Sequence, residues 1–166
     1  SMMVKGYPAY IVSKDCAEKG VSKFVPYIFT KEELKRFFTV CDSIEPNPNS
    51  PNSYLIIPMI FRVLYGCGLR VSEAINLKIK DIDLENGVLT ILEAKYGKER
   101  LIPMTLGLTK QCEIFCSKIH LGSNSESYFF PAPDGRLYST KAVYDNFRLM
   151  LFAANISHGG KGYGPR

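Results

Sequence analysis

The sequence predicts a mainly helical α+β domain with one small antiparallel β-sheet. Four stretches have the apolar spacing of helices, and a stretch between the second and third reads as two short strands joined by a turn. With 166 residues, 46% of them hydrophobic, the chain has enough apolar material for one domain with its own core. We place that domain at residues 26–166. Residues 1–25 lack apolar periodicity and read as a tether or the remnant of an upstream region.

The first two helices have recognisable starts. Thr30 and Glu33 form a capping-box pattern, in which the hydroxyl of Thr30 accepts from the third helical amide and Glu33 reaches back. The helix that follows carries apolar residues on one side. After a loop at residues 46–53, the apolar run at residues 54–65 predicts a largely buried helix, with Pro58 near its first turn or at a kink.

An arginine corner follows the second helix. Gly66 and Gly68 give the backbone access to positive φ and leave room for a bulky group to approach. Arg70 then projects from a rigid corner between two helices, where its planar guanidinium can grip a phosphate with two hydrogen bonds. An ordinary helix-turn-helix corner with a solvated arginine has the same local sequence. Glu73, one turn further, can orient Arg70 or simply favour the helix start.

A β-hairpin is predicted next, after a turn that closes on Asn-Gly. Residues 88–92 are β-branched and apolar, and residues 100–104 return as the second strand. The tip between them carries two ammonium groups, Lys95 and Lys98. The order is therefore helix, arginine corner, helix, and a hairpin with lysines at its tip.

Three elements complete the domain. Residues 108–121 predict a helix, residues 128–131 a short buried segment, and Ser139 caps a helix that runs to about Ala154. The glycine-rich tail from Ser157 offers little that could pack into a core.

Charge and cysteine content narrow the class of protein only slightly. The net charge of +5 favours a polyanionic partner, but it is equally common in proteins that bind none. The five cysteines are odd in number and scattered, which indicates reduced thiols in a cytosol. Cys112, Cys116 and His120 share one face of a predicted helix. Three soft ligands could begin a zinc site, but a structural zinc needs four, and a half-buried helix face explains them better. No signal peptide or membrane-spanning run is visible.

Two boxes in a fixed order carry a family resemblance. Gly-Leu-Arg-Val-Ser-Glu at residues 68–73 is followed by Lys-Tyr-Gly-Lys-Glu-Arg-Leu-Ile-Pro-Met at residues 95–104. In this order they closely resemble the tyrosine recombinases, the phage integrase family. The close resemblance runs from about residue 26 to residue 104, and weaker similarity continues to the end of the chain.

The resemblance implies a DNA breaking-rejoining catalytic domain without a cofactor or metal. In the family a tyrosine attacks a DNA phosphodiester and forms a 3′-phosphotyrosine link. Arg70 matches the first of two arginines that clamp the phosphate, and Lys95 matches the lysine that protonates the leaving 5′-oxygen. Glu73 would support Arg70, whereas Lys98 and Arg100 would contact the DNA.

The same resemblance implies partners and a setting. The full-length parent would bind double-stranded DNA in a synaptic tetramer of recombinase protomers, and would come from a bacterial mobile element or prophage. Its place would be the cytoplasm, in association with the nucleoid, and no membrane partner is expected.

The chain departs from the family near its end. The family's second box, His-x-x-Arg, is absent, because neither His120 nor His158 has an arginine three positions later. The nucleophilic tyrosine that follows this box also has no match, and Tyr163 lies in a glycine-rich tail. We therefore expect the N-terminal part of a catalytic domain, truncated before this box and inactive by itself.

Two alternatives remain open at this point. The chain could be a non-catalytic DNA-binding module that contacts phosphates through Arg70 and Lys95. It could also be an unrelated helical interaction domain, in which case these residues would point to opposite faces.

A truncated domain is also expected to leave apolar side chains uncovered. We expect an exposed patch that includes some of the following residues: Ile60, Leu64, Phe147 and Leu151.

Overall fold

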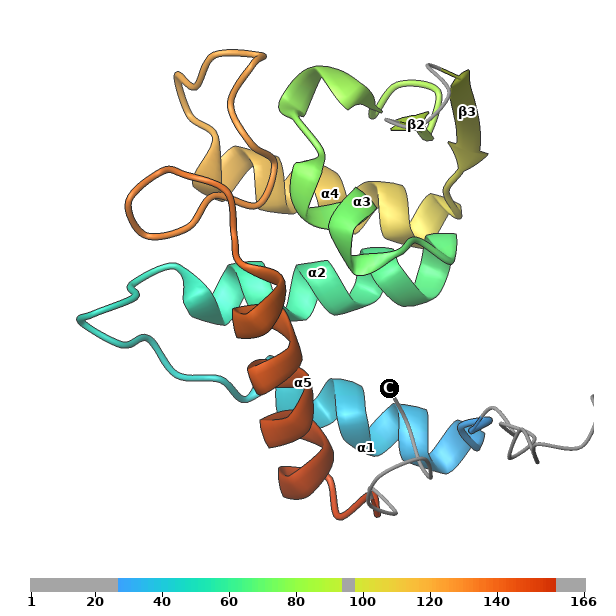
Figure 1. Cartoon of the computed structure of the whole chain (residues 1–166), viewed down its shortest axis with the longest axis vertical. Helices are drawn as coiled ribbons and strands as arrows, with labels where there is room; N and C mark the ends of the chain where they lie inside the picture. The colour runs from blue at the N-terminus through green and yellow to red at the C-terminus, as the bar shows by residue number, and fades with distance from the viewer. Residues whose placement is uncertain (1–26, 94–97, 158–166) are drawn as a thin grey trace, which may run out of the picture. The chain divides into compact units, whose positions relative to one another are not determined.

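The computed structural model describes residues 27–93 and 98–157, which form the predicted helical domain with a small antiparallel sheet (Figure 1). Its elements are, in chain order, α1 (Lys31–Asp42), α2 (Ser53–Cys67), α3 (Val71–Asn76), the 3₁₀-helix η3 (Ile79–Asp81), β1 (Ile82–Asp83), β2 (Val88–Glu93), β3 (Lys98–Pro103), α4 (Leu106–Ile119) and α5 (Thr140–Ala153). None of the helices in this described part is long and apolar enough to cross a membrane. The predicted tether at residues 1–25 lies outside the described residues.

Side-chain caps fix the starts of three helices. The hydroxyl of Thr30 accepts from the amide of Glu33 at 3.1 Å, and the Glu33 carboxylate accepts from the amide of Thr30 at 2.8 Å. This confirms the predicted capping box. Ser139 caps α5, as predicted. Thr105 caps α4, so this helix begins ahead of the predicted start at residue 108.

Helix α2 lies in the middle of the helical layer and packs against α1, α3 and α4 (Figure 1). Its central residues are buried, and Ile60 and Val63 have no exposed surface. Pro58 lies inside this helix, and the guanidinium of Arg62 donates to its carbonyl at 3.3 Å. The proline is therefore accommodated within α2 and does not end it.

The sheet has three antiparallel strands in the order β1-β2-β3. Strand β2 pairs with β3 over its whole length, with Ile91 opposite Arg100. The sequence predicted this hairpin but assigned β1 to a turn. Ile82 and Asp83 pair with Leu89 and Val88, and this short pairing adds the third strand.

A second, aromatic part of the core lies under α4. Phe129 and Phe130 are fully buried, and the ring of Phe115 lies 5.1 Å and 5.7 Å from theirs, measured between centroids. The ring of His120 joins this cluster at 5.5 Å from that of Phe129. The prediction of a buried segment at residues 128–131 is thus confirmed for the two phenylalanines.

The predicted apolar patch is not formed by the residues named for it. Ile60 and Leu151 are 0% and 1% exposed, so the prediction is wrong for them, and Leu64 and Phe147 are half-buried. The physical reason is that other helices of the domain cover both elements: α2 packs against α1, α3 and α4, and α5 packs against α1 and α3. Phe37 of α1 brings its ring to 5.7 Å from that of Phe147.

The large exposed apolar side chains lie elsewhere. Leu149 and Phe152, on the outer side of α5, are 57% and 82% exposed, and Tyr65 near the end of α2 is 62% exposed. Leu92 and Leu101 are exposed on the outer face of the hairpin.

Candidate functional site

The candidate site starts at the corner between α2 and α3. Gly68 ends α2 in the left-handed conformation, with φ at 62°, which a glycine adopts without strain. Gly66 allows a close approach instead, since a Cβ there would lie 2.9 Å from the side chain of Leu108 in α4. The two glycines therefore have the two roles expected for them, and Arg70 follows as the residue that precedes α3.

Glu73 holds the backbone of this corner. Its Oε2 accepts from the amide of Arg70 at 2.8 Å, and its Oε1 accepts from the Arg70 guanidinium at 3.3 Å. The Glu73 side chain is only 10% exposed, whereas that of Arg70 is 75% exposed. The side chain of Arg70 therefore presents most of its surface to solvent. Its backbone is held in place by the bond from its amide to Glu73, one helical turn further on.

Arg100 brings the hairpin to the same carboxylate. Its Nη1 donates to Oε1 of Glu73 at 3.0 Å, and its Nη2 donates to Oε2 at 2.9 Å. This is the two-pronged geometry in which arginine and carboxylate interact most strongly. The structure thus places Arg70, Glu73 and Arg100 together, although they come from the α2–α3 corner, α3 and β3.

Opposing effects act on the pKa of Glu73. Burial alone would raise it, but hydrogen bonds from Arg100 and from the backbone of Arg70, together with the charges of both guanidiniums, lower the pKa below its ordinary value of 4.5. Glu73 is therefore ionised at neutral pH. Two guanidiniums and one carboxylate leave this cluster with a net positive charge.

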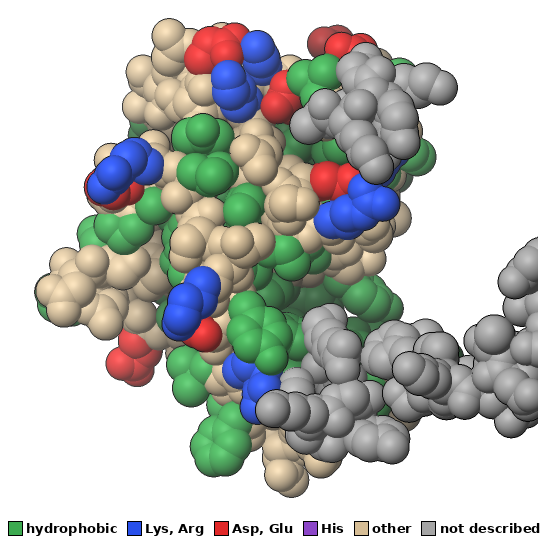
Figure 2. Space-filling view, viewed as in Figure 1, with side chains coloured by type: hydrophobic (Ala, Val, Ile, Leu, Met, Phe, Trp, Pro, Cys, Tyr) green, Lys and Arg blue, Asp and Glu red, His purple; other side chains and the backbone are tan. Residues whose placement is uncertain are grey.

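Several other charges among the described residues form ion pairs. Figure 2 shows basic and acidic side chains lying next to each other in separate small groups on the face in view. Examples are the ion pairs of Lys78 and Lys80 with Glu126, at 2.9 Å and 2.6 Å. These two lysines lower the pKa of Glu126 to about 2.

The two predicted lysines are less completely described. Lys95 lies outside the described residues. The backbone of Lys98 begins β3 opposite Glu93, two residues before Arg100. The orientation of the lysine tip relative to Arg70 therefore stays a prediction.

The side chains considered for a zinc site lie on a partly buried helix face, with Cys112 buried and Cys116 and His120 half-buried. Cys112 has no exposed surface, and burial raises the pKa of its thiol to about 12. A ring nitrogen of His120 lies 2.9 Å from the carbonyl oxygen of Phe129. In the part of the chain that the structure describes, no group of three or more His, Cys, Asp or Glu side chains could hold a metal ion.

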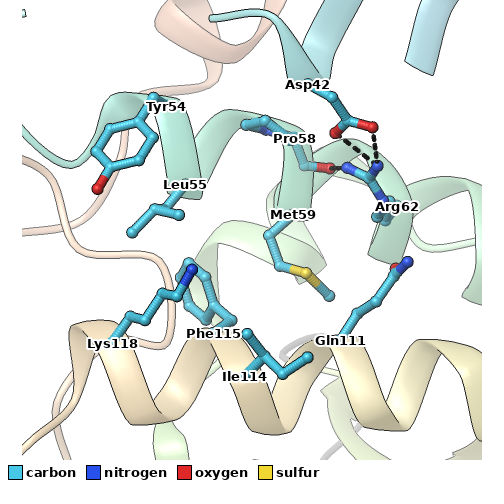
Figure 3. A pocket seen from close by; sticks show the side chains of 10 residues that line it. All are labelled: Asp42, Tyr54, Leu55, Pro58, Met59, Arg62, Gln111, Ile114, Phe115 and Lys118. Atoms are coloured by element: carbon cyan, nitrogen blue, oxygen red, sulfur yellow. Dashed lines mark hydrogen bonds and ion pairs between the residues drawn. The ribbon is translucent and has the colours of Figure 1, made fainter. Parts of the chain in front are cut away.

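A surface pocket of about 320 Å³ lies between α2 and α4 (Figure 3). One wall carries the ion pair of Arg62 with Asp42 at 2.6 Å, and Ile114, Phe115 and Lys118 of α4 line the other. None of its lining residues belongs to the predicted site, and sequence reasoning did not find it because its residues show no motif.

Comparison with known proteins shows the family. The model of the phage integrase family matches residues 28–162, so the chain belongs to this family. It is 37% identical over 131 residues to tyrosine recombinase XerA of Thermococcus kodakarensis, covering 79% of this chain and 42% of that protein.

Two solved structures share the fold. A crystal structure of XerA recombinase has a TM-score of 0.66 and 21% identity, covering 87% of this chain and 48% of that chain. The post-cleavage complex of the site-specific recombinase XerH with its palindromic difH substrate has a TM-score of 0.65 and 22% identity, covering 82% and 38%. The chain spans less than half the length of these relatives.

Proposed function

We propose that this chain is part of the catalytic domain of a tyrosine recombinase that cuts and rejoins DNA at specific sites. The observation that carries the proposal is the exposed guanidinium of Arg70 on a corner that Glu73 fixes, next to a hairpin held by Arg100. Membership of the phage integrase family and the likeness to XerA support it. XerH, which shares the fold, is bound to its difH substrate in a post-cleavage complex, and this supports double-stranded DNA as the ligand.

The proposed chemistry is transfer of a phosphodiester to a tyrosine. The tyrosine hydroxyl gives up its proton to the surrounding solvent as its oxygen forms a bond to phosphorus, and the bond from phosphorus to the 5′-oxygen breaks. Negative charge grows on the non-bridging oxygens during this step, and Arg70 would stabilise it through hydrogen bonds that are already oriented. Lys95 would give a proton to the 5′-oxygen as it leaves. Rejoining reverses the same steps and needs no metal or nucleotide.

The remaining predicted site residues keep supporting roles in this proposal. Glu73 orients Arg70, and Lys98, at the start of β3, contacts a backbone phosphate. The predicted DNA contact of Arg100 remains untested, and its two-pronged bond to Glu73 favours a different role.

We also propose that this chain alone does not cleave DNA. It contains no His-x-x-Arg sequence, and a covalent mechanism cannot proceed without its nucleophile. The second candidate function, a DNA-binding module that does not cleave, has the same requirement for Arg70. Assembly into a synaptic tetramer belongs to the full-length protein and stays a prediction.

A trapping experiment separates the two functions. The substrate is a nicked duplex that loses the strand released by cleavage, so that a phosphotyrosine link accumulates and can be seen on a denaturing gel. This chain should give no shifted band. The same chain joined to the rest of its natural reading frame should give one, and Arg70→Ala should remove it. A longer protein that binds the duplex but never forms the link would favour the binding module.

A further inference from the structure

The hairpin directs Arg100 toward α3. Residues of a strand alternate between two faces, and on this hairpin the buried side is marked by Leu89 and Ile91, which are 0% and 3% exposed. Arg100 lies directly opposite Ile91, whereas its neighbour Leu101 is 68% exposed on the outer face. The side chain of Arg100 is 37% exposed. The pleat of the sheet thus aims this arginine at Glu73.

The carboxylate of Glu73 accepts shorter hydrogen bonds from the Arg100 guanidinium than from the Arg70 guanidinium. Arg100 supplies two, at 3.0 Å and 2.9 Å, and the Arg70 amide supplies one at 2.8 Å. The guanidinium of Arg70 supplies a longer one at 3.3 Å. Arg100 therefore provides the charged partner that this largely buried carboxylate needs, and Arg70 is bound to it only weakly through its side chain.

We propose that Arg100 is a positioning residue that acts through Glu73 and keeps the guanidinium of Arg70 available to a DNA phosphate. This inference rests on the proposed function, in which Arg70 binds the phosphate. Its new element is the assignment of Arg100, which would work without touching DNA. It also links the hairpin, which carries the lysines, to the arginine corner.

The consequence of losing Arg100 follows from the burial of Glu73. An ionised carboxylate that is only 10% exposed is costly without a partner. The nearest guanidinium is that of Arg70, already at 3.3 Å, and it would turn onto the carboxylate. A DNA phosphate would then compete with Glu73 for the same donors. The cluster would also lose its net positive charge, which weakens attraction of the phosphate.

Four variants of this chain test the assignment through binding to a short fluorescent duplex at low salt. Arg70→Ala and Arg100→Ala should each weaken binding by roughly 3- to 10-fold. Glu73→Gln is the reference background for the second comparison, because its amide oxygen can still accept from the Arg70 amide while the negative charge beside Arg70 is gone. The double variant Glu73→Gln/Arg100→Ala should bind within about twofold of Glu73→Gln, because a neutral amide does not capture Arg70. Thermal unfolding of each variant checks that it is folded.

The pH dependence gives a readout that a general loss of structure would not give. In Arg100→Ala, Glu73 loses the hydrogen bonds and the charge of Arg100 that help to lower its pKa, so its pKa rises. Binding by Arg100→Ala should therefore recover relative to the unmodified chain as the pH is lowered, and the double variant should show no such recovery. If Arg100→Ala does not fold, Arg100→Lys replaces it, because lysine keeps the positive charge but cannot make the two-pronged bond to Glu73. This variant should show an intermediate loss of DNA binding, and adding Glu73→Gln should remove that loss.

The outcomes distinguish this inference from the function on which it rests. Arg100→Ala is compared in two backgrounds, the unmodified chain and Glu73→Gln. If it weakens DNA binding equally in both, Arg100 contacts DNA directly and the inference is overturned. If it weakens nothing in either background, the inference is also overturned. If Arg70→Ala itself leaves binding unchanged, the proposed role of Arg70 fails, and the inference fails with it.

Discussion

Single residues determine the direction of Arg70. Gly68 turns the chain at the end of α2 with a positive φ, and Glu73 ties the amide of Arg70 from the next helix. Neither residue needs to touch DNA for the corner to work. A small change in either residue would move the guanidinium without altering its chemistry. Such a shift matters because the hydrogen-bond donors must already be in place when the phosphate binds.

Substitution of Gly68 should be costly. Gly68→Ala places a side chain at φ 62°, where it is strained, and should lower the free energy of unfolding by about 1–2 kcal/mol. Gly107→Ala, in α4, is the control, because nothing lies within 4 Å of its Cβ and no positive φ is required. It should be neutral or stabilising by up to about 1 kcal/mol. Urea unfolding of both variants measures this, and equal stabilities would contradict the role given to Gly68 in the corner.

His120 should make stability depend on pH. Burial lowers the pKa of this ring below its ordinary value of 6.5, although the hydrogen bond with the Phe129 carbonyl opposes the shift. The unfolded chain therefore takes up the proton first, and stability that is present above pH 6.5 is lost as the pH falls toward the pKa of the folded state. Urea unfolding at several pH values should show this loss, and His120→Gln should make it smaller. An unchanged slope in that variant would show that another group is responsible.

At the scale of elements, side chains from different helices hold the domain together. Arg62 of α2 pairs with Asp42 at the end of α1 through contacts of 2.6 Å and 2.7 Å, and its guanidinium lies 5.3 Å from the centre of the Phe38 ring. Arg36 of α1 donates to the carbonyl of Ala154 after α5 at 3.0 Å. These contacts fix α1 against its two neighbours.

Arg62 and Arg148 offer a matched comparison at this scale. Both guanidiniums lie over an aromatic ring, Arg148 at 6.0 Å from the centre of the Tyr144 ring within one exposed helix face. Arg62→Met should lower the free energy of unfolding by about 1–2 kcal/mol, because it removes contacts that join α1 to α2 and takes away the ion-pair partner of Asp42. Arg148→Met should stay within about 0.5 kcal/mol. Thermal unfolding that ranks the two variants the other way would contradict this role for Arg62.

Local sequence patterns predicted the helices and strands themselves better than they predicted the contacts between them. The capping box of α1, the Ser139 cap and the hairpin are encoded in adjacent residues, and all three are present. The strand β1 was missed because two residues carry no periodicity of their own. The burial of Ile60 and Leu151 was also missed, because it depends on packing between helices that are far apart in the sequence.

In the candidate site, too, the contact between residues close in sequence was predictable and the contact between distant residues was not. Arg70 and Glu73 are close in sequence, so their proximity was predictable from helical spacing. The bond between Glu73 and Arg100 joins residues 27 positions apart and requires the register of β2 and β3. Sequence contained one usable signal for it: the alternation that places Arg100 on the same side of the hairpin as Ile91.

At the scale of the whole molecule, we expect a weak, general affinity for DNA. Several basic side chains of the described surface are held in ion pairs, so only a few phosphates should be contacted. With about three to five contacts, log K should fall with log salt with a slope of about −3 to −4. Binding should depend little on DNA sequence, because contacts to phosphates carry no base information. Tight, salt-insensitive binding to one sequence would contradict this picture.

The measurement that tests the central claim most directly is the salt slope of duplex binding by Arg70→Ala beside Arg136→Ala. The two arginines are similarly exposed, at 75% and 85%, and each pairs with a carboxylate close by in sequence, Glu73 and Asp134. If Arg70 grips a phosphate, its removal should weaken binding and reduce the slope by about 1, while Arg136→Ala should leave both nearly unchanged. Equal slopes for the unmodified chain and Arg70→Ala would contradict the claim that this corner is a phosphate site.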